Sequence, residues 1–185
     1  MKTKRLFAIV ILLAVTGVAI ASIPAARVGN DNQAPELPSP VCDNLQVEPG
    51  NKVNFHVYAR GVQIYRWNGT TWDFVGPLAM LFADADYQGQ VGIHYATPNG
   101  PAWESNSGSK VIATRQAGCT PDLSAIPWLL LKTVSTTGPG IFSPVTFIQR
   151  VNTTGGLAPT APGTMVNEVV EIPYTTEYYF YRAED

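Results

Sequence analysis

The sequence predicts an all-β fold: an antiparallel β-sandwich or flattened β-barrel of seven to ten short strands with little helix. Apolar residues recur with a period of two along most of the chain, the pattern of strands with one buried face. Turn residues separate these runs at spacings near ten residues, and the chain holds 16 glycines and 15 prolines. No segment keeps a helical period. Packed sheets, or one sheet curled on itself, would bury the apolar faces.

Each predicted strand is a short alternating run bounded by turn residues. Gly61 follows the first run, and we interpret it as a tight connection or a bulge. Gly76-Pro77 is interpreted as a break between two later runs. Residues 126–131 are solidly apolar and predict a buried strand or a short helix. The other predicted strands are residues 52–60, 62–67, 72–75, 78–82, 90–96, 110–115, 145–152 and 174–182.

The chain divides into three parts. Residues 1–21 have a basic start, an apolar run and a small-residue cleavage site, which predict a secretory signal peptide; an uncleaved anchor is the alternative. Residues 22–50 hold five prolines among polar residues and predict a linker. Residues 51–185 predict a single β domain. The expected location is therefore secreted, periplasmic or otherwise extracytoplasmic.

Charge and cysteine content narrow the partners. Residues 1–21 contain three of the twelve basic side chains and none of the fourteen acidic ones, so the mature chain would carry about −5. A charge-poor, weakly acidic chain is a poor match for nucleic acid or an anionic membrane surface, and we expect neither as a partner after cleavage. Cys42 and Cys119 predict a disulfide in an exported protein, and two separate buried thiols are the alternative.

The common catalytic and cofactor motifs are missing from the sequence. It has no G-x-G-x-x-G, no phosphate-binding loop, no G-x-S-x-G, no C-x-x-C and no H-E-x-x-H. We therefore predict no cofactor and no metal site, and we exclude a Rossmann-type dehydrogenase.

The segment from Val91 to Val111 is the densest in chemically useful side chains. On a strand, His94 shares a face with Gly92 and Ala96, which leaves space around the imidazole, whereas Tyr95 would face the core. Trp103 and Glu104 follow a proline turn and could fold back beside His94. A carboxylate beside an imidazole orients a general base. A buried structural histidine and a ligand-binding histidine are the alternatives.

Three further polar residues are candidates for a ligand site. Ser109 closes the same segment. Gln149 shares a strand face with apolar residues, so we expect a buried amide that needs partners. Arg150 points to the opposite face and is a candidate partner for Glu104 or for a ligand carboxylate, a surface salt bridge being the alternative.

Aromatic residues suggest the kind of ligand. The chain holds four tryptophans and eight tyrosines, and exposed aromatics on a β scaffold are a common platform for sugar rings, although core packing uses the same residues. The leading hypothesis is a non-catalytic module that binds an extracellular carbohydrate or a cell-wall or matrix polymer. The alternatives are a structural or envelope-associated protein without a ligand, and a hydrolase or isomerase that uses His94 with Glu104.

Five phrases together resemble one known family. They are the runs at residues 59–67, 91–111, 126–133 (IPWLLLKT), 145–159 (VTFIQRVNTTGGLAP) and 174–182 (YTTEYYFYR). In this order they resemble the secreted bacterial and fungal family called domain of unknown function 3455, over about residues 45–182. The resemblance implies export but no settled activity. It also implies one cysteine where this chain has Trp67 and another where it has residues 160–163. Their absence fits a lost disulfide, and a Cys42–Cys119 bridge in its place is one interpretation.

Overall fold

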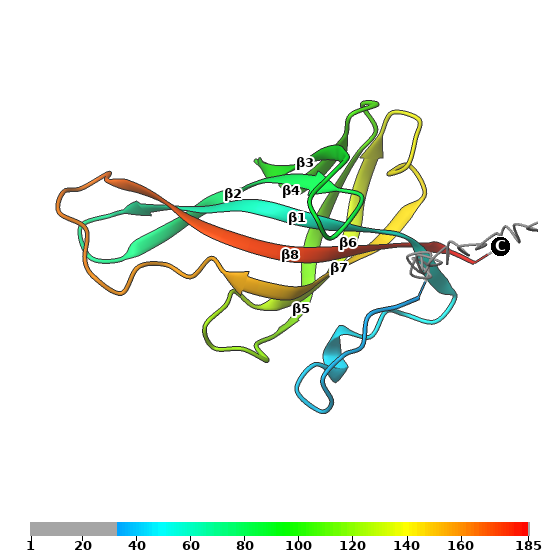
Figure 1. The fold of residues 1–185 in the computed structure, drawn as a ribbon, viewed down its shortest axis with the longest axis horizontal. Coiled ribbons are helices and arrows are strands. Elements are labelled where there is room, and N and C mark those ends of the chain that lie inside the picture. The colour runs from blue at the N-terminus through cyan, green and yellow to red at the C-terminus, as the bar shows by residue number, and fades with distance from the viewer. Residues whose placement is uncertain (1–32, 185) are drawn as a thin grey trace, which may run out of the picture.

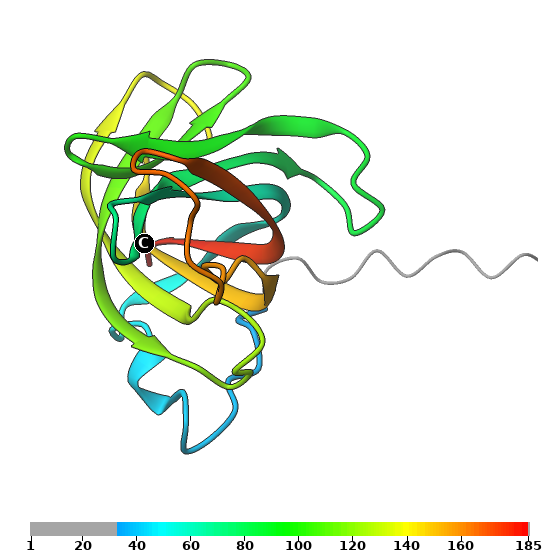
Figure 2. The ribbon, with the colours of Figure 1, turned by 90° about the vertical axis from the view of Figure 1, so that its left-hand side faces the viewer.

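Eight antiparallel strands close into a single barrel in the computed structural model, which describes residues 33–184 (Figures 1 and 2). Each strand pairs with the next along the chain, and the last returns to pair with the first. The predicted all-β class and strand number are confirmed. The strands are β1 (Asn51–Trp67), β2 (Trp72–Phe82), β3 (Gln90–Thr97), β4 (Gly100–Ser105), β5 (Lys110–Cys119), β6 (Trp128–Thr137), β7 (Val145–Gly155) and β8 (Val169–Ala183).

Helical structure among the described residues is limited to one 3₁₀ turn, η1 (Asp43–Leu45). Residues 126–131 therefore hold no helix, and β6 begins at Trp128 within this apolar run. In the part of the chain that the structure describes, no helix has the length and apolar character needed to cross a bilayer.

The two glycine interruptions predicted from the sequence are wrong, because β1 and β2 run through them without a break. At Gly61 the backbone of β2 comes so close that an added Cβ would lie 2.2 Å from the carbonyl oxygen of Leu78. The glycine therefore marks a close approach of two strands rather than a turn. Gly76 has φ +156° and stays paired with Ile64, next to a shift in strand register.

Apolar side chains gather on both sides of the barrel wall. The interior core includes Leu81, Trp103, Ile148, Tyr178 and Phe180, which come from β2, β4, β7 and β8. A second core lies on the outer face of the wall, where Trp128, Phe147, Val151 and Tyr181 of β6, β7 and β8 pack against η1. Because alternate residues of these strands enter different cores, both faces of the strands are buried here.

The N-terminal segment covers this outer core. It belongs to the region predicted as a linker, residues 22–50, of which the structure describes residues 33–50. Cys42 and Leu45 are fully buried, and Cys42 is bonded to Cys119 at the end of β5, which confirms the predicted disulfide. The described part of this region is thus packed against the barrel (Figure 1). The predicted signal peptide, residues 1–21, lies outside the described residues.

Candidate functional site

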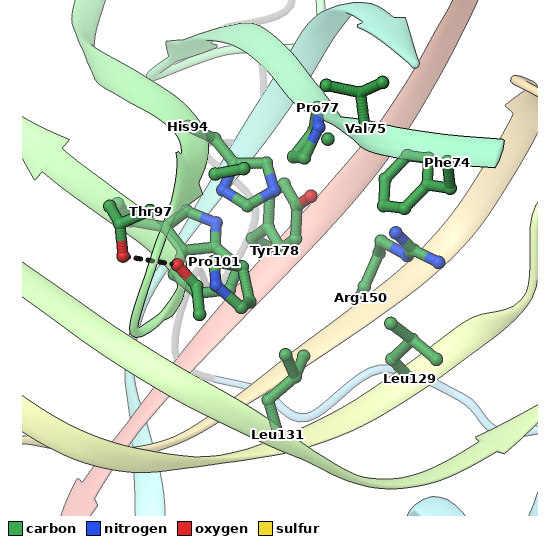
Figure 3. A pocket seen from close by; sticks show the side chains of 14 residues that line it. Phe74, Val75, Pro77, His94, Thr97, Pro101, Leu129, Leu131, Arg150 and Tyr178 are labelled. Atoms are coloured by element: carbon green, nitrogen blue, oxygen red, sulfur yellow. Dashed lines mark hydrogen bonds between the residues drawn. The ribbon is translucent and has the colours of Figure 1, made fainter. Parts of the chain in front are cut away.

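A cavity of about 230 Å³ lies in the barrel wall and interior, between β2, the β3–β4 hairpin, β6, β7 and β8 (Figure 3). Most of its lining is apolar, and Arg150 is the one charged side chain among the lining residues. The lining residues are Phe74, Val75, Gly76, Pro77, His94, Ala96, Thr97, Gly100, Pro101, Trp103, Leu129, Leu131, Arg150 and Tyr178.

His94 is held rigidly in this cavity by the β3–β4 hairpin. Strand register places it opposite Trp103, and the two rings stack with centroids 4.3 Å apart. Its Nδ1 lies 2.8 Å from the carbonyl oxygen of Ala102. A carbonyl only accepts, so Nδ1 carries the proton and donates it. The side chain is 2% exposed, and this burial lowers the pKa of His94 to about 3. At neutral pH the imidazole is therefore uncharged, with Nε2 as an acceptor.

Arg150 places a positive charge beside the cavity. The guanidinium is partly buried, and its Nε and Nη2 both donate to the carbonyl oxygen of Pro127, at 3.1 and 2.7 Å. Within residues 33–184, no ion pair joins it to a carboxylate. Burial raises the pKa of Tyr178 and lowers the pKa of His94, and the charge of Arg150 adds a smaller lowering effect on each. A partly buried cation without a carboxylate attracts an anion.

Tyr178 lies between His94 and Arg150 in the cavity (Figure 3). It is fully buried, and its ring meets that of His94 edge-on at 5.2 Å. Arg150, Trp103 and Tyr174 surround its hydroxyl, yet the hydroxyl makes no hydrogen bond of good geometry with a described residue. The Trp103 Nε1–H is equally unpaired. Buried polar groups usually have a partner, so this corner of the barrel has unused capacity for hydrogen bonds.

The structure brings together three of the six residues predicted for the site: His94, Trp103 and Arg150 line one cavity. Glu104 does not join them. It is the next residue after Trp103 on β4, so its side chain points to the outer face of the barrel. There its carboxylate accepts a hydrogen bond from the Tyr95 hydroxyl and lies 3.9 Å from the Lys110 Nζ. The expected pairing of Glu104 with His94 or Arg150 is therefore absent, and Tyr95 faces outward rather than into the core.

Ser109 and Gln149 also lie outside the cavity. Ser109 is fully buried near the barrel end, where its hydroxyl oxygen accepts from the backbone N–H of Phe142 and contacts the hydroxyl of Ser105. Gln149 is buried in the outer core, as expected of a buried amide with partners: it donates to the carbonyl of Leu45 and accepts from the Tyr181 hydroxyl. Both residues hold structural positions.

Sequence reasoning missed Tyr178 and the apolar walls formed by Phe74 and Leu129. The alternation in β8 was a usable signal, because Tyr174, Tyr178 and Phe180 share the inner face while Tyr179 and Tyr181 face outward. Which face is inner depends on how the sheet curls, and the alternation alone leaves that open.

An imidazole–carboxylate pair does exist, but it uses the other histidine. His56 Nε2 lies 2.9 Å from an oxygen of Glu177 on the outer face of β1 and β8. Tyr179 stacks on His56 at 4.3 Å, and Asn152 donates to the second oxygen of Glu177. Burial acts to raise the pKa of Glu177, but the nearby His56 imidazole and the hydrogen bond from Asn152 outweigh it and lower the pKa. The cluster ties β1, β7 and β8 together.

A shallow groove of about 340 Å³ lies at the end of β1, beside residues 158–162. Trp67 and Trp72 form its aromatic floor, with ring centroids 5.4 Å apart, and Trp72 donates to the carbonyl of Ala161. Trp67 packs directly on Gly163, where an added Cβ would lie 2.5 Å from the ring. The two places where the family resemblance implies cysteines are therefore adjacent in space. Among the described residues, no cluster of three or more acidic, histidine or cysteine side chains is arranged to hold a metal ion.

Comparison with known proteins gives one match. No curated protein and no solved structure is significantly similar to the chain. The model of one family, described as "Protein of unknown function (DUF3455)", matches residues 48–182, which include all eight strands except the last residue of β8. The predicted family is thereby confirmed, and the chain belongs to this family of unknown function.

Proposed function

We propose that this protein is an exported, non-catalytic binding module whose barrel cavity takes a small, largely apolar anion. The observation that carries the proposal is the Arg150 guanidinium, which has no carboxylate partner among the described residues and lies beside an otherwise apolar cavity. The signal-like N-terminus and the Cys42–Cys119 bridge support export, because stable disulfides form mainly outside the cytosol.

The size of the cavity favours a small ligand over an extracellular carbohydrate or cell-wall polymer. A cavity of about 150 Å³ holds one benzene molecule, so the 230 Å³ here fits a single ring with one or two substituents. A polymer chain needs an open groove, whereas this space is bounded by residues of six strands. Trp103 is 1% exposed and therefore offers no platform to a sugar polymer.

The charge of the ligand follows from Arg150. Two of its nitrogens are fixed on the Pro127 carbonyl, which aims the guanidinium and leaves other N–H groups available. Hydrogen bonds to a charged group contribute about 1.5–3 kcal/mol, more than neutral ones. A carboxylate on the ligand would neutralise the cation and occupy these donors.

Calorimetric titration with benzoate and the uncharged benzyl alcohol tests this proposal. We expect benzoate to bind more tightly, and Arg150→Met to weaken benzoate binding by about 10- to 100-fold while leaving benzyl alcohol nearly unchanged. Methionine keeps the packing of the stem. Arg66→Gln, at an exposed position on β1, is the matched control and should bind like the wild type. Equal binding of the acid and the alcohol, or no effect of Arg150→Met, contradicts the proposal.

A carbohydrate-binding role remains a second candidate, now at the Trp67–Trp72 groove. The aromatic pair lies beside the exposed hydroxyl residues Thr70 and Thr71, the combination that sugar rings use for stacking and hydrogen bonding. Pull-down on insoluble polysaccharides tests it. Trp72→Ala should abolish retention and Tyr87→Ala, a partly buried aromatic away from the groove, should not; no retention of the wild type on any polysaccharide counts against this role.

A further inference from the structure

We infer that the ligand carries a hydroxyl group as well as an anionic group, and that His94 Nε2 accepts the hydroxyl proton. The ligand class is a hydroxylated single-ring carboxylic acid, such as a hydroxybenzoate. This inference rests on the proposed function, because it assigns the second polar contact in the same cavity.

The tautomer of His94 is fixed by its hydrogen bond to the backbone. Nδ1–H is committed to the Ala102 carbonyl at 2.8 Å, and this is the one hydrogen bond that the imidazole makes with a described residue. The ring is stacked on Trp103, 4.3 Å away, and meets Tyr178 edge-on, so it has little freedom to turn over. In the neutral imidazole, the nitrogen without a proton only accepts. A group that binds there must therefore donate a proton.

The polar groups of the cavity differ in whether they donate or accept hydrogen bonds. Arg150 only donates, His94 Nε2 only accepts, and the Tyr178 hydroxyl next to both is able to do either. Figure 3 shows these three side chains around one space, with Tyr178 between the other two. A complementary ligand has an acceptor toward Arg150 and a donor toward His94. A carboxylate and a hydroxyl on one ring have this arrangement.

The remaining lining of the cavity is mostly apolar. Pro77, Pro101, Leu129 and Leu131 line the space around the polar groups and offer no hydrogen bonds from their side chains. The ligand body between carboxylate and hydroxyl must therefore be apolar. A sugar acid, with hydroxyls around its ring, would leave several of them unpaired against this wall, at a cost of about 1–3 kcal/mol each.

Binding of matched benzoates to the wild type tests the inference. We expect 3- or 4-hydroxybenzoate to bind at least tenfold more tightly than the corresponding fluorobenzoate, which has a similar shape and no proton to donate. His94→Phe should remove this preference, because phenylalanine keeps the stacking on Trp103 but has no acceptor. Hydroxy- and fluorobenzoate are compared within each protein, so a general loss of affinity in the variant does not imitate the expected result.

A second measurement needs no variant. The ¹⁵N NMR signal of His94 Nε2 should move toward that of a hydrogen-bonded nitrogen when a hydroxybenzoate binds, and should stay in place with fluorobenzoate. Equal affinities for hydroxy- and fluorobenzoates, with an unmoved Nε2 signal, would overturn this inference while Arg150-dependent binding still upholds the proposed function. Absence of Arg150-dependent binding of any benzoate would overturn both.

Discussion

His94, Arg150 and Tyr178 each use only part of their hydrogen-bonding capacity within the protein. His94 commits Nδ1, Arg150 commits two nitrogens to one carbonyl, and the Tyr178 hydroxyl commits nothing. The committed bonds fix where the side chains of His94 and Arg150 point, and both residues line the cavity. This division is what a binding site requires, because orientation is set before a ligand arrives.

Replacing Tyr178 by phenylalanine should not destabilise the protein. Its buried hydroxyl lacks a partner, so its removal is expected to leave the free energy of unfolding unchanged or to raise it by about 1–2 kcal/mol. Tyr181→Phe is the matched control: it leaves Gln149 without the hydroxyl that donates to it, and should cost about 1–3 kcal/mol. Urea unfolding measures both, and a larger loss for Tyr178→Phe than for Tyr181→Phe contradicts the expectation.

The pH dependence of stability should contain a contribution from His94. Its pKa is near 6.5 in the unfolded chain and about 3 in the folded protein, chiefly because of burial. Between these values the unfolded state binds a proton that the folded state does not. The contribution of neutral His94 to the free energy of unfolding is therefore fully present above pH 6.5. It falls by about 1.4 kcal/mol per pH unit as the pH drops toward 3.

Urea unfolding of the wild type and of His94→Gln, from pH 7.5 to 3.5, isolates this contribution. Glutamine does not titrate, so the difference in free energy of unfolding between the two proteins should shrink steadily below pH 6.5. Other titrating groups contribute equally to both proteins and cancel. A constant difference across the range would show that His94 titrates normally in the folded state.

At the scale of the strands, close backbone contact is the feature most sensitive to change. Gly61→Ala should lower the free energy of unfolding by about 1–3 kcal/mol or more, because the added Cβ would meet the backbone of Leu78 and Ala79 within 2.4 Å. Gly118→Ala on β5 is the matched control, since its nearest neighbour is the end of the flexible Arg115 side chain. Thermal unfolding should show a clearly lower Tm for Gly61→Ala alone; equal values contradict the close approach.

Most strands could be predicted from the sequence, but which face of each strand is buried could not always be predicted. The alternating runs lie within six of the eight strands, although β1 and β2 were each divided in two and β4 was not predicted. The same period placed His94 and Tyr95 on opposite faces. It gave the wrong side for Tyr95, because the apolar Val91 and Ile93 at alternate positions suggested a buried face, whereas Val91 packs against the interior core and Ile93 is 37% exposed. It also treated Gly61 as a break, since a glycine at a turn and a glycine under a neighbouring strand look alike in sequence.

At the scale of the whole molecule, closure of the barrel could not be read from the sequence. It depends on β1 pairing with β8 along most of their length, between residues more than a hundred positions apart. The site depends on this closure, since Arg150 on β7 and Tyr178 on β8 meet the β3–β4 hairpin only when the sheet is curled. Sequence proximity suggested Glu104 as the partner of His94, whereas the closed sheet supplies Tyr178.

The Cys42–Cys119 bridge should stabilise the whole molecule without shaping the cavity. It joins residues 77 positions apart, and the chain-entropy model credits a loop of this length with about 4.5 kcal/mol, as an upper value. The bridge lies in the outer core, separated from the cavity by the barrel wall. Cys42→Ser/Cys119→Ser should therefore lose about 2–4 kcal/mol of unfolding free energy while benzoate affinity stays within about twofold.

Wild type measured with and without reductant is the control, and the reduced protein should match the double variant. Loss of benzoate binding in a still-folded double variant would mean that the N-terminal segment holds the cavity in shape.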